Sequence, residues 1–198
     1  MNGFLAGLKQ PEYVHVLINH LPITGLFAAM LGLVGSLLIR KRAAVFLSMI
    51  LVGLFAISAW PVYVYGEKGF DRVYAMSDDD GAAYLKHHKK LAEEWIWVFY
   101  VTAAASAVGI AAGLKWPRSI WISAVIVLLL TIGSLVAGGF IADFGGKVRH
   151  PEFQKGPPPK DPDENAFFKT PWNPVGQSAF SFPCARKNPP GKEFLQSC

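Results

Sequence analysis

The chain has 198 residues, of which 52% are hydrophobic and 17% are charged. Soluble domains carry about 25% charged residues, so this composition excludes a soluble enzyme, a disulfide-stapled secreted domain and a disordered chain. The net charge of +5 does not indicate nucleic-acid binding, because the basic residues gather in the C-terminal part and beside the apolar segments. We therefore expect an integral membrane protein that contacts the lipid bilayer and has no nucleic-acid partner.

The apolar residues fall into four runs, each long enough to cross a hydrocarbon core of about 30 Å. These runs predict transmembrane helices at 14–39, 43–65, 91–114 and 119–142. Short connections within the first and second pairs of helices make sequence neighbours antiparallel. The expected fold class is therefore an all-α membrane protein, an up-down-up-down bundle of four transmembrane helices.

The two short connections, 40–42 and 115–118, carry basic residues and no acidic residue, which is typical of the cytoplasmic side. The N-terminus, a predicted loop at 66–90 and the C-terminus then lie on the opposite side. We expect a multi-pass protein of the bacterial inner (cytoplasmic) membrane with both termini in the periplasm. The first apolar run is too long for a cleavable signal peptide, so we expect it to stay in the mature protein.

The C-terminal segment has a different composition, with ten of the 14 prolines after residue 144. We therefore predict a transmembrane domain at 1–144 and an extended, proline-rich periplasmic tail at 145–198. The tail also contains many Phe and Trp side chains, which favour an arm laid on a partner subunit over a tail folded on its own bundle. Both cysteines, Cys184 and Cys198, lie in this tail, where they either form a disulfide or remain free thiols.

The five histidines are the main candidates for a functional site, because the predicted topology places all of them at the non-cytoplasmic face. They are His15, His20, His87, His88 and His150. On a continuous helix His15 and His20 point about 140° apart, so they do not bind one ion together. We expect His20 and His88 to be the axial ligands of a haem, with His15 and His150 serving a second haem or supporting the first.

Other interpretations of these residues stay open. Histidine is common at the depth of lipid headgroups without binding any cofactor, and the same imidazoles also suit copper or zinc. Glu93 and Glu94 could accept protons from a quinol or fix a histidine tautomer, or simply stabilise a helix N-terminus. The sequence has no Cys-x-x-Cys-His motif for covalent haem and no nucleophile elbow, so no independent enzymatic activity is predicted.

Three segments resemble an uncharacterised family of four-helix bacterial membrane proteins, a domain of unknown function. Residues 16–23 (Val-Leu-Ile-Asn-His-Leu-Pro-Ile) are similar to its His-Phe-Pro-Ile-Ala signature. His88, followed by the small residue Ala92, resembles the second histidine that opens the third span of the family. Residues 145–152 (Gly-Gly-Lys-Val-Arg-His-Pro-Glu) resemble a segment that follows the fourth span in some relatives. The resemblance covers about 13–152.

The resemblance implies a four-helix fold and marks His20, His88 and His150, although Leu21 replaces the usual Phe. Haem b or another redox metal is suspected for such bundles. We therefore expect a membrane electron-transfer subunit within a larger redox complex, with other membrane subunits and either quinol or a periplasmic cytochrome as partners. The alternative is a cofactor-free accessory subunit that fills a gap in a membrane complex and holds its partners with the tail.

Overall fold

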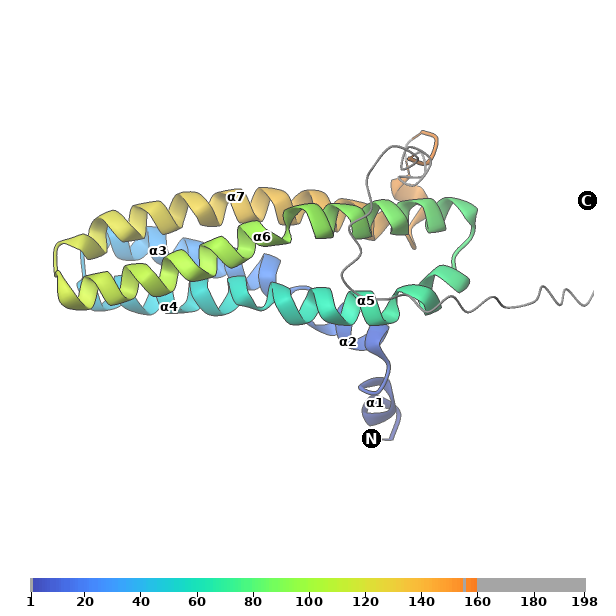
Figure 1. Ribbon diagram of the computed structural model, residues 1–198, viewed down its shortest axis with the longest axis horizontal. Coiled ribbons are helices and arrows are strands. Elements are labelled where there is room, and N and C mark those ends of the chain that lie inside the picture. Colours follow the sequence, from blue (N-terminus) through green and yellow to red (C-terminus); the bar gives the residue numbers. More distant parts are fainter. Residues whose placement is uncertain (1, 155, 160–198) are drawn as a thin grey trace, which may run out of the picture. The chain divides into compact units, whose positions relative to one another are not determined.

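The computed structural model describes residues 2–154 and 156–159, which form helices and turns without a β-strand (Figure 1). The helices are α1 (Asn2–Gly7), α2 (Pro11–Ile18), the π-helix η1 (Leu21–Gly25), α3 (Leu26–Ile39), α4 (Arg42–Ile57), α5 (Ala59–Ala75), α6 (Asp79–Lys115), α7 (Ser119–Lys147) and the 3-10 helix η2 (Pro151–Phe153). Most of the predicted tail, including Cys184 and Cys198, lies outside the described residues.

Four helical stretches of the described chain are long and apolar enough to cross a membrane. They are Pro11–Ile39, Arg42–Ala75, Asp79–Lys115 and Ser119–Lys147. Each contains one of the four runs predicted from the sequence, so the all-helical fold class with four membrane-length helices is confirmed. The stretches are longer than predicted: α6 has 37 residues, which correspond to about 55 Å of helix.

The predicted loop at 66–90 is wrong. Helix α5 continues to Ala75 and α6 already begins at Asp79, so only a short turn separates them. The side chain of Asp78 accepts a hydrogen bond of 2.8 Å from the backbone N–H of Gly81, which caps the start of α6. Polar sequence after an apolar run predicts a loop, whereas in this chain it extends α5 and α6 past the apolar runs.

The first two stretches are interrupted close to prolines. Pro22 lies in η1, where the carbonyl of His20 accepts from the N–H of Thr24 at 2.7 Å. Proline has no N–H to donate, so the regular helical ladder is broken at this point. Similarly, α4 ends at Ile57, four residues before Pro61 in α5. The two interruptions separate α2 and α5 from α3 and α4, and so let the two parts take different directions.

The core is made by α3, α4, α6 and α7. Helix α6 packs on both α4 and α7, and α3 packs on α4 and α7. Large apolar side chains such as Leu33 and Met49 are fully buried. The hydroxyls of Thr102 and Ser134 lie 2.8 Å apart and join α6 to α7. Close helix contact depends on Gly109, where a Cβ would lie 2.7 Å from Met49 Cε.

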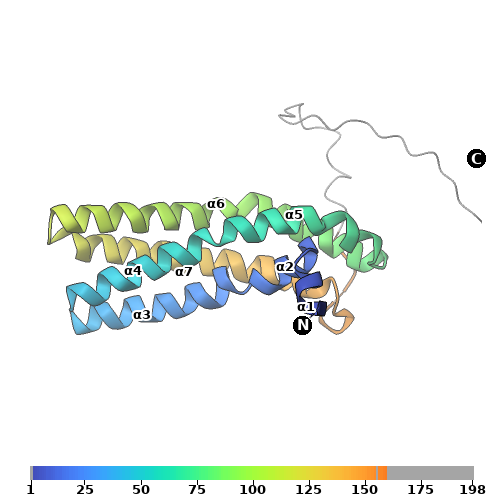
Figure 2. The same ribbon diagram turned by 90° about the horizontal axis from the view of Figure 1, so that it is seen from below.

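The two ends of the bundle differ. The α3–α4 and α6–α7 connections lie at one end, as Figure 1 shows, and there Arg42 donates to the carbonyl of Gly113. At the other end α2 packs on α5, which packs on the first part of α6 (Figure 2). The last part of α7 also reaches this end. This second end contains the candidate site.

Candidate functional site

His15 of α2 and His88 of α6 lie next to each other between the helices. Their ring centroids are 6.5 Å apart and their ring planes are almost perpendicular, at 85°. Both residues are partly buried. The structure thus brings together two histidines from separate helices, which the sequence had placed at the same end.

Each imidazole is held by a backbone carbonyl of the next membrane-length helix. The Nδ1 atom of His15 lies 2.8 Å from the carbonyl oxygen of Val62, and that of His88 lies 2.8 Å from the carbonyl oxygen of Ile141. A carbonyl oxygen only accepts hydrogen bonds, so Nδ1 carries the proton in both rings. In a neutral imidazole Nε2 then keeps its lone pair, which can bind a metal ion or accept a proton.

A glycine follows each carbonyl by four residues. A Cβ on Gly66 would lie 3.0 Å from Nδ1 of His15, and a Cβ on Gly145 would lie 3.1 Å from Nδ1 of His88. In an α-helix the carbonyl of residue i lies beside residue i+4, because it accepts that residue's N–H. The missing side chain therefore lets the ring approach the carbonyl closely.

The same arrangement thus occurs in both halves of the bundle. In Pro11–Ile39 and Arg42–Ala75, the histidine comes from the first stretch, and the carbonyl and glycine come from the second. Asp79–Lys115 and Ser119–Lys147 repeat this order. The two histidines meet where the halves meet. Neither glycine nor carbonyl was predicted from the sequence, although an inward-facing glycine near the end of an apolar run was a usable signal.

Polar atoms flank His15 on its own helix. Glu12 and Asn19 lie three residues before and four residues after it, hence on the same face of α2. Oε1 of Glu12 pairs with Arg72 at 2.9 Å. Among the described residues, Oε2 of Glu12 and Oδ1 of Asn19 are buried without a hydrogen-bond partner. Such acceptors are costly when left unpaired, so a donor, from water or from a bound group, would be stabilised beside His15.

The other three histidines lie elsewhere. His20 is exposed and precedes η1. The ring of His87 contacts that of Phe144, with centroids 4.4 Å apart and the planes tilted by 48°. His150 is exposed beyond α7, with Nδ1 2.9 Å from Oε1 of Glu152. Within the described residues, no hydrogen bond or ring contact joins these three to the His15–His88 pair. The sequence analysis paired His88 with His20, whereas here His15 is its neighbour.

The surface contact between His150 and Glu152 affects the carboxyl group. The backbone N–H of Glu152 itself, and then the side chain of His150, hydrogen-bond the carboxylate and lower the pKa of Glu152 below its ordinary value. Both side chains are largely exposed. This pair is therefore a local surface feature and has no described link to His88.

The two predicted acidic candidates are engaged by lysines of α6. Lys89 pairs with Glu67 of α5 at 2.9 Å and with Glu93 at 3.9 Å. Lys90 lies 4.0 Å from Glu94. The Lys89–Glu67 pair joins α5 to α6 beside His88, and the two pairs within α6 each add about 0.2–0.5 kcal/mol to the helix.

The donor set of the histidine pair can be compared with the needs of different metals. No group of three or more His, Cys, Asp or Glu side chains in the described part of the chain could hold a metal ion. Zinc sites take three or four protein ligands, and copper sites are similar. A haem iron needs at most two, because the porphyrin supplies four nitrogens. Two imidazoles are therefore fewer protein ligands than zinc or copper sites use, and they equal the number that a haem iron can take.

Comparison with protein-family models, with curated proteins and with solved structures gives no match. The family resemblance of residues 13–152 accordingly depends on the motif residues quoted above.

Proposed function

We propose that this protein is a membrane electron-transfer subunit that binds haem b between His15 and His88. The observation that carries the proposal is the pairing of two imidazoles whose Nδ1 atoms are both bound to carbonyls. Their spacing also supports it. The ring centroids lie 6.5 Å apart, which is close enough for the side chains of two helices to hold one bound group.

The proposed membrane placement is an up-down-up-down bundle in the bacterial inner membrane with both termini in the periplasm. The basic connections at 40–42 and 115–118 then mark the cytoplasmic surface. Counting 20 residues, or about 30 Å, along α6 from Lys115 leads to Trp95, where an aromatic side chain suits the opposite interface. His88 lies about 10 Å further, at the outer edge of the headgroup region. The site would thus be close to periplasmic electron carriers.

In this proposal the carbonyls and the glycines have different roles. The carbonyls of Val62 and Ile141 fix the tautomer and direction of the two imidazoles. Gly66 and Gly145 leave room for the imidazole rings beside the accepting helices. Burial between helices limits the access of water. A haem held here supplies one-electron transfer, between a quinol or a membrane subunit on one side and a periplasmic cytochrome on the other.

The proposal is tested by the haem content of the purified full-length protein, measured as a pyridine haemochrome together with a reduced-minus-oxidised spectrum. We expect about one b-type haem per chain. His15→Asn and His88→Asn should each abolish this signal, while the control variant His20→Asn keeps it. A wild-type protein without haem, or with copper or zinc in its place, would contradict the proposal, as would a loss confined to His20→Asn.

A second candidate, a cofactor-free accessory subunit, is favoured by one observation. The two histidine–carbonyl hydrogen bonds tie α2 to α5 and α6 to α7, which is useful to the fold without any cofactor. The Asn variants separate the two functions, because the amide nitrogen of Asn takes nearly the position of Nδ1 and can keep the bond to the carbonyl. A structural role therefore predicts that the Asn variants retain every property of the wild type.

A further inference from the structure

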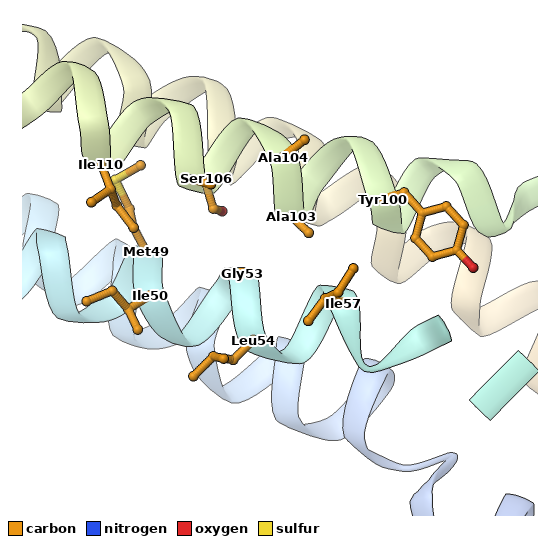
Figure 3. A pocket seen from close by; sticks show the side chains of 11 residues that line it. Met49, Ile50, Gly53, Leu54, Ile57, Tyr100, Ala103, Ala104, Ser106 and Ile110 are labelled. Carbon is orange, nitrogen blue, oxygen red and sulfur yellow. The ribbon is translucent and has the colours of Figure 1, made fainter. Parts of the chain in front are cut away.

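A groove of about 470 Å³ lies between α4 and α6 (Figure 3). The histidine pair does not line this groove. Its lining is apolar apart from Ser106 and Tyr100. Ile50 and Leu54, which border it, are 44% and 59% exposed, so the groove opens to the outside of the bundle. On the proposed placement, this outside is the hydrocarbon core of the membrane.

Ser106 differs from three other buried hydroxyls of the bundle. Thr102, Thr131 and Ser134 each donate to the carbonyl four residues earlier, at 2.9, 2.7 and 3.0 Å. Ser106 is 1% exposed, and its Oγ has no hydrogen-bond partner among the described residues. Figure 3 shows its side chain directed from α6 toward Gly53 of α4. A buried hydroxyl without an acceptor is costly in apolar surroundings.

Small residues surround this hydroxyl. Helices α4 and α6 approach closely here, since a Cβ on Gly53 would lie 3.3 Å from Cβ of Ser106 and 4.0 Å from its Oγ. Ala103 and Ala107 also line the groove. The part of the groove next to the unpaired donor is therefore lined by small apolar residues, and a ring with a hydrogen-bond acceptor placed there would supply the missing partner.

We propose that this groove binds the ring of an isoprenoid quinone, with a quinone carbonyl oxygen accepting the proton of Ser106. Ser106 lies nine residues from Lys115, about 13 Å along the helix and hence near the middle of the membrane. Acyl chains carry no acceptor at that depth, and the ester oxygens of phospholipids stay at the headgroups. A quinone carries carbonyl oxygens on an apolar body with an apolar tail. The inference uses the membrane placement proposed above and does not depend on haem.

The test measures binding of decylubiquinone to the full-length protein in lipid nanodiscs, by quenching of tyrosine and tryptophan fluorescence above that of free indole in empty nanodiscs. Ser106→Ala should weaken binding about tenfold, the usual effect of one lost hydrogen bond. Ala107→Leu, which fills the groove from an exposed position, should weaken it at least as much. Ser36→Ala removes a buried hydroxyl elsewhere, and Ala111→Leu repeats the larger substitution one turn away outside the groove, so both should bind like wild type.

Three outcomes would overturn the inference. The first is the absence of saturable binding, and the second is wild-type affinity in both Ser106→Ala and Ala107→Leu. The third is equal competition by decane, which would make the occupant an acyl chain. Because binding is measured without reference to haem, a protein that lacks haem can still bind quinone, and a protein with haem can fail to. The two proposals therefore fail separately.

Discussion

The imidazole of His88 donates to the carbonyl of Ile141 at the same distance, 2.8 Å, at which His15 donates to Val62. In each case the ring lies against a glycine one turn further along the accepting helix. The same three features, a histidine, an accepting carbonyl and a glycine, thus occur in two unrelated stretches of sequence.

The first prediction concerns Gly145. A Cβ there would lie 3.0 Å from Cε1 of His88, so Gly145→Ala should displace the ring. We expect a loss of about 1–3 kcal/mol in the free energy of unfolding, as for other overpacked sites, and a lower haem content. Thermal unfolding in detergent and the haemochrome assay measure the two effects.

Gly139 of the same helix provides the control for this substitution, because a Cβ there would meet nothing within 4 Å. Gly139→Ala should be neutral or stabilise the helix by up to about 1 kcal/mol. Equal stability and equal haem content in the two alanine variants would show that the ring of His88 does not need the glycine.

The second prediction replaces one ligand by another. Methionine also binds haem iron and raises its midpoint potential relative to histidine. His88→Met should therefore retain a haem with a shifted spectrum and a higher potential in a redox titration, whereas His88→Ala should lose it. His87→Met, at the neighbouring residue whose ring contacts Phe144, should leave the potential unchanged. A midpoint potential that changes in His87→Met and not in His88→Met would contradict the prediction, because His87 would then be the ligand.

The third prediction concerns the hydroxyl contact between α6 and α7. Thr102 and Ser134 lie 2.8 Å apart in the core. A double-mutant cycle of Thr102→Val and Ser134→Ala should give a coupling of about 0.6 kcal/mol, the average for hydrogen bonds between membrane helices. Each single variant should retain haem, because the contact is remote from the histidine pair. Zero coupling would mean that the hydroxyls do not bind each other.

The fourth prediction is a titration. The lowered pKa of Glu152 implies that this carboxylate adds to stability above its unfolded-state pKa, and that the contribution is lost as the pH falls through the folded-state value. Carboxyl NMR should find the group titrating below its ordinary range. Since its own backbone N–H is the larger cause, His150→Ala should raise the pKa only part of the way back. A complete return to the ordinary value would make His150 the main cause.

Much of the fold was predictable because a bilayer leaves few choices. Apolar runs of this length must form helices, and their basic ends define the short connections. The charged segment around Lys89 was taken for part of a loop because hydropathy reports the membrane boundary and not the end of a helix. Ion pairs with Glu67 and Glu93 keep this segment helical beyond that boundary.

The candidate site was predictable only in part. The sequence placed His15 and His88 at one end of the bundle, but their pairing depends on where α2 runs after the interruption at Pro22. That direction is set by packing, including the approach of the Glu12 backbone to Gly69, where a Cβ would lie 2.9 Å from the Glu12 nitrogen. The hydrophobic periodicity of the sequence does not reveal the direction of α2.

The electron paramagnetic resonance spectrum of the oxidised, haem-containing protein reports whether His15 and His88 both bind the iron. Two axial imidazoles make the iron low-spin, and nearly perpendicular ring planes, 85° apart for His15 and His88, give a highly anisotropic low-spin signal. We predict that signal in the wild type and in His20→Asn. A high-spin signal, which would mean that one of the two imidazoles is not bound, or no haem signal at all, would contradict the account.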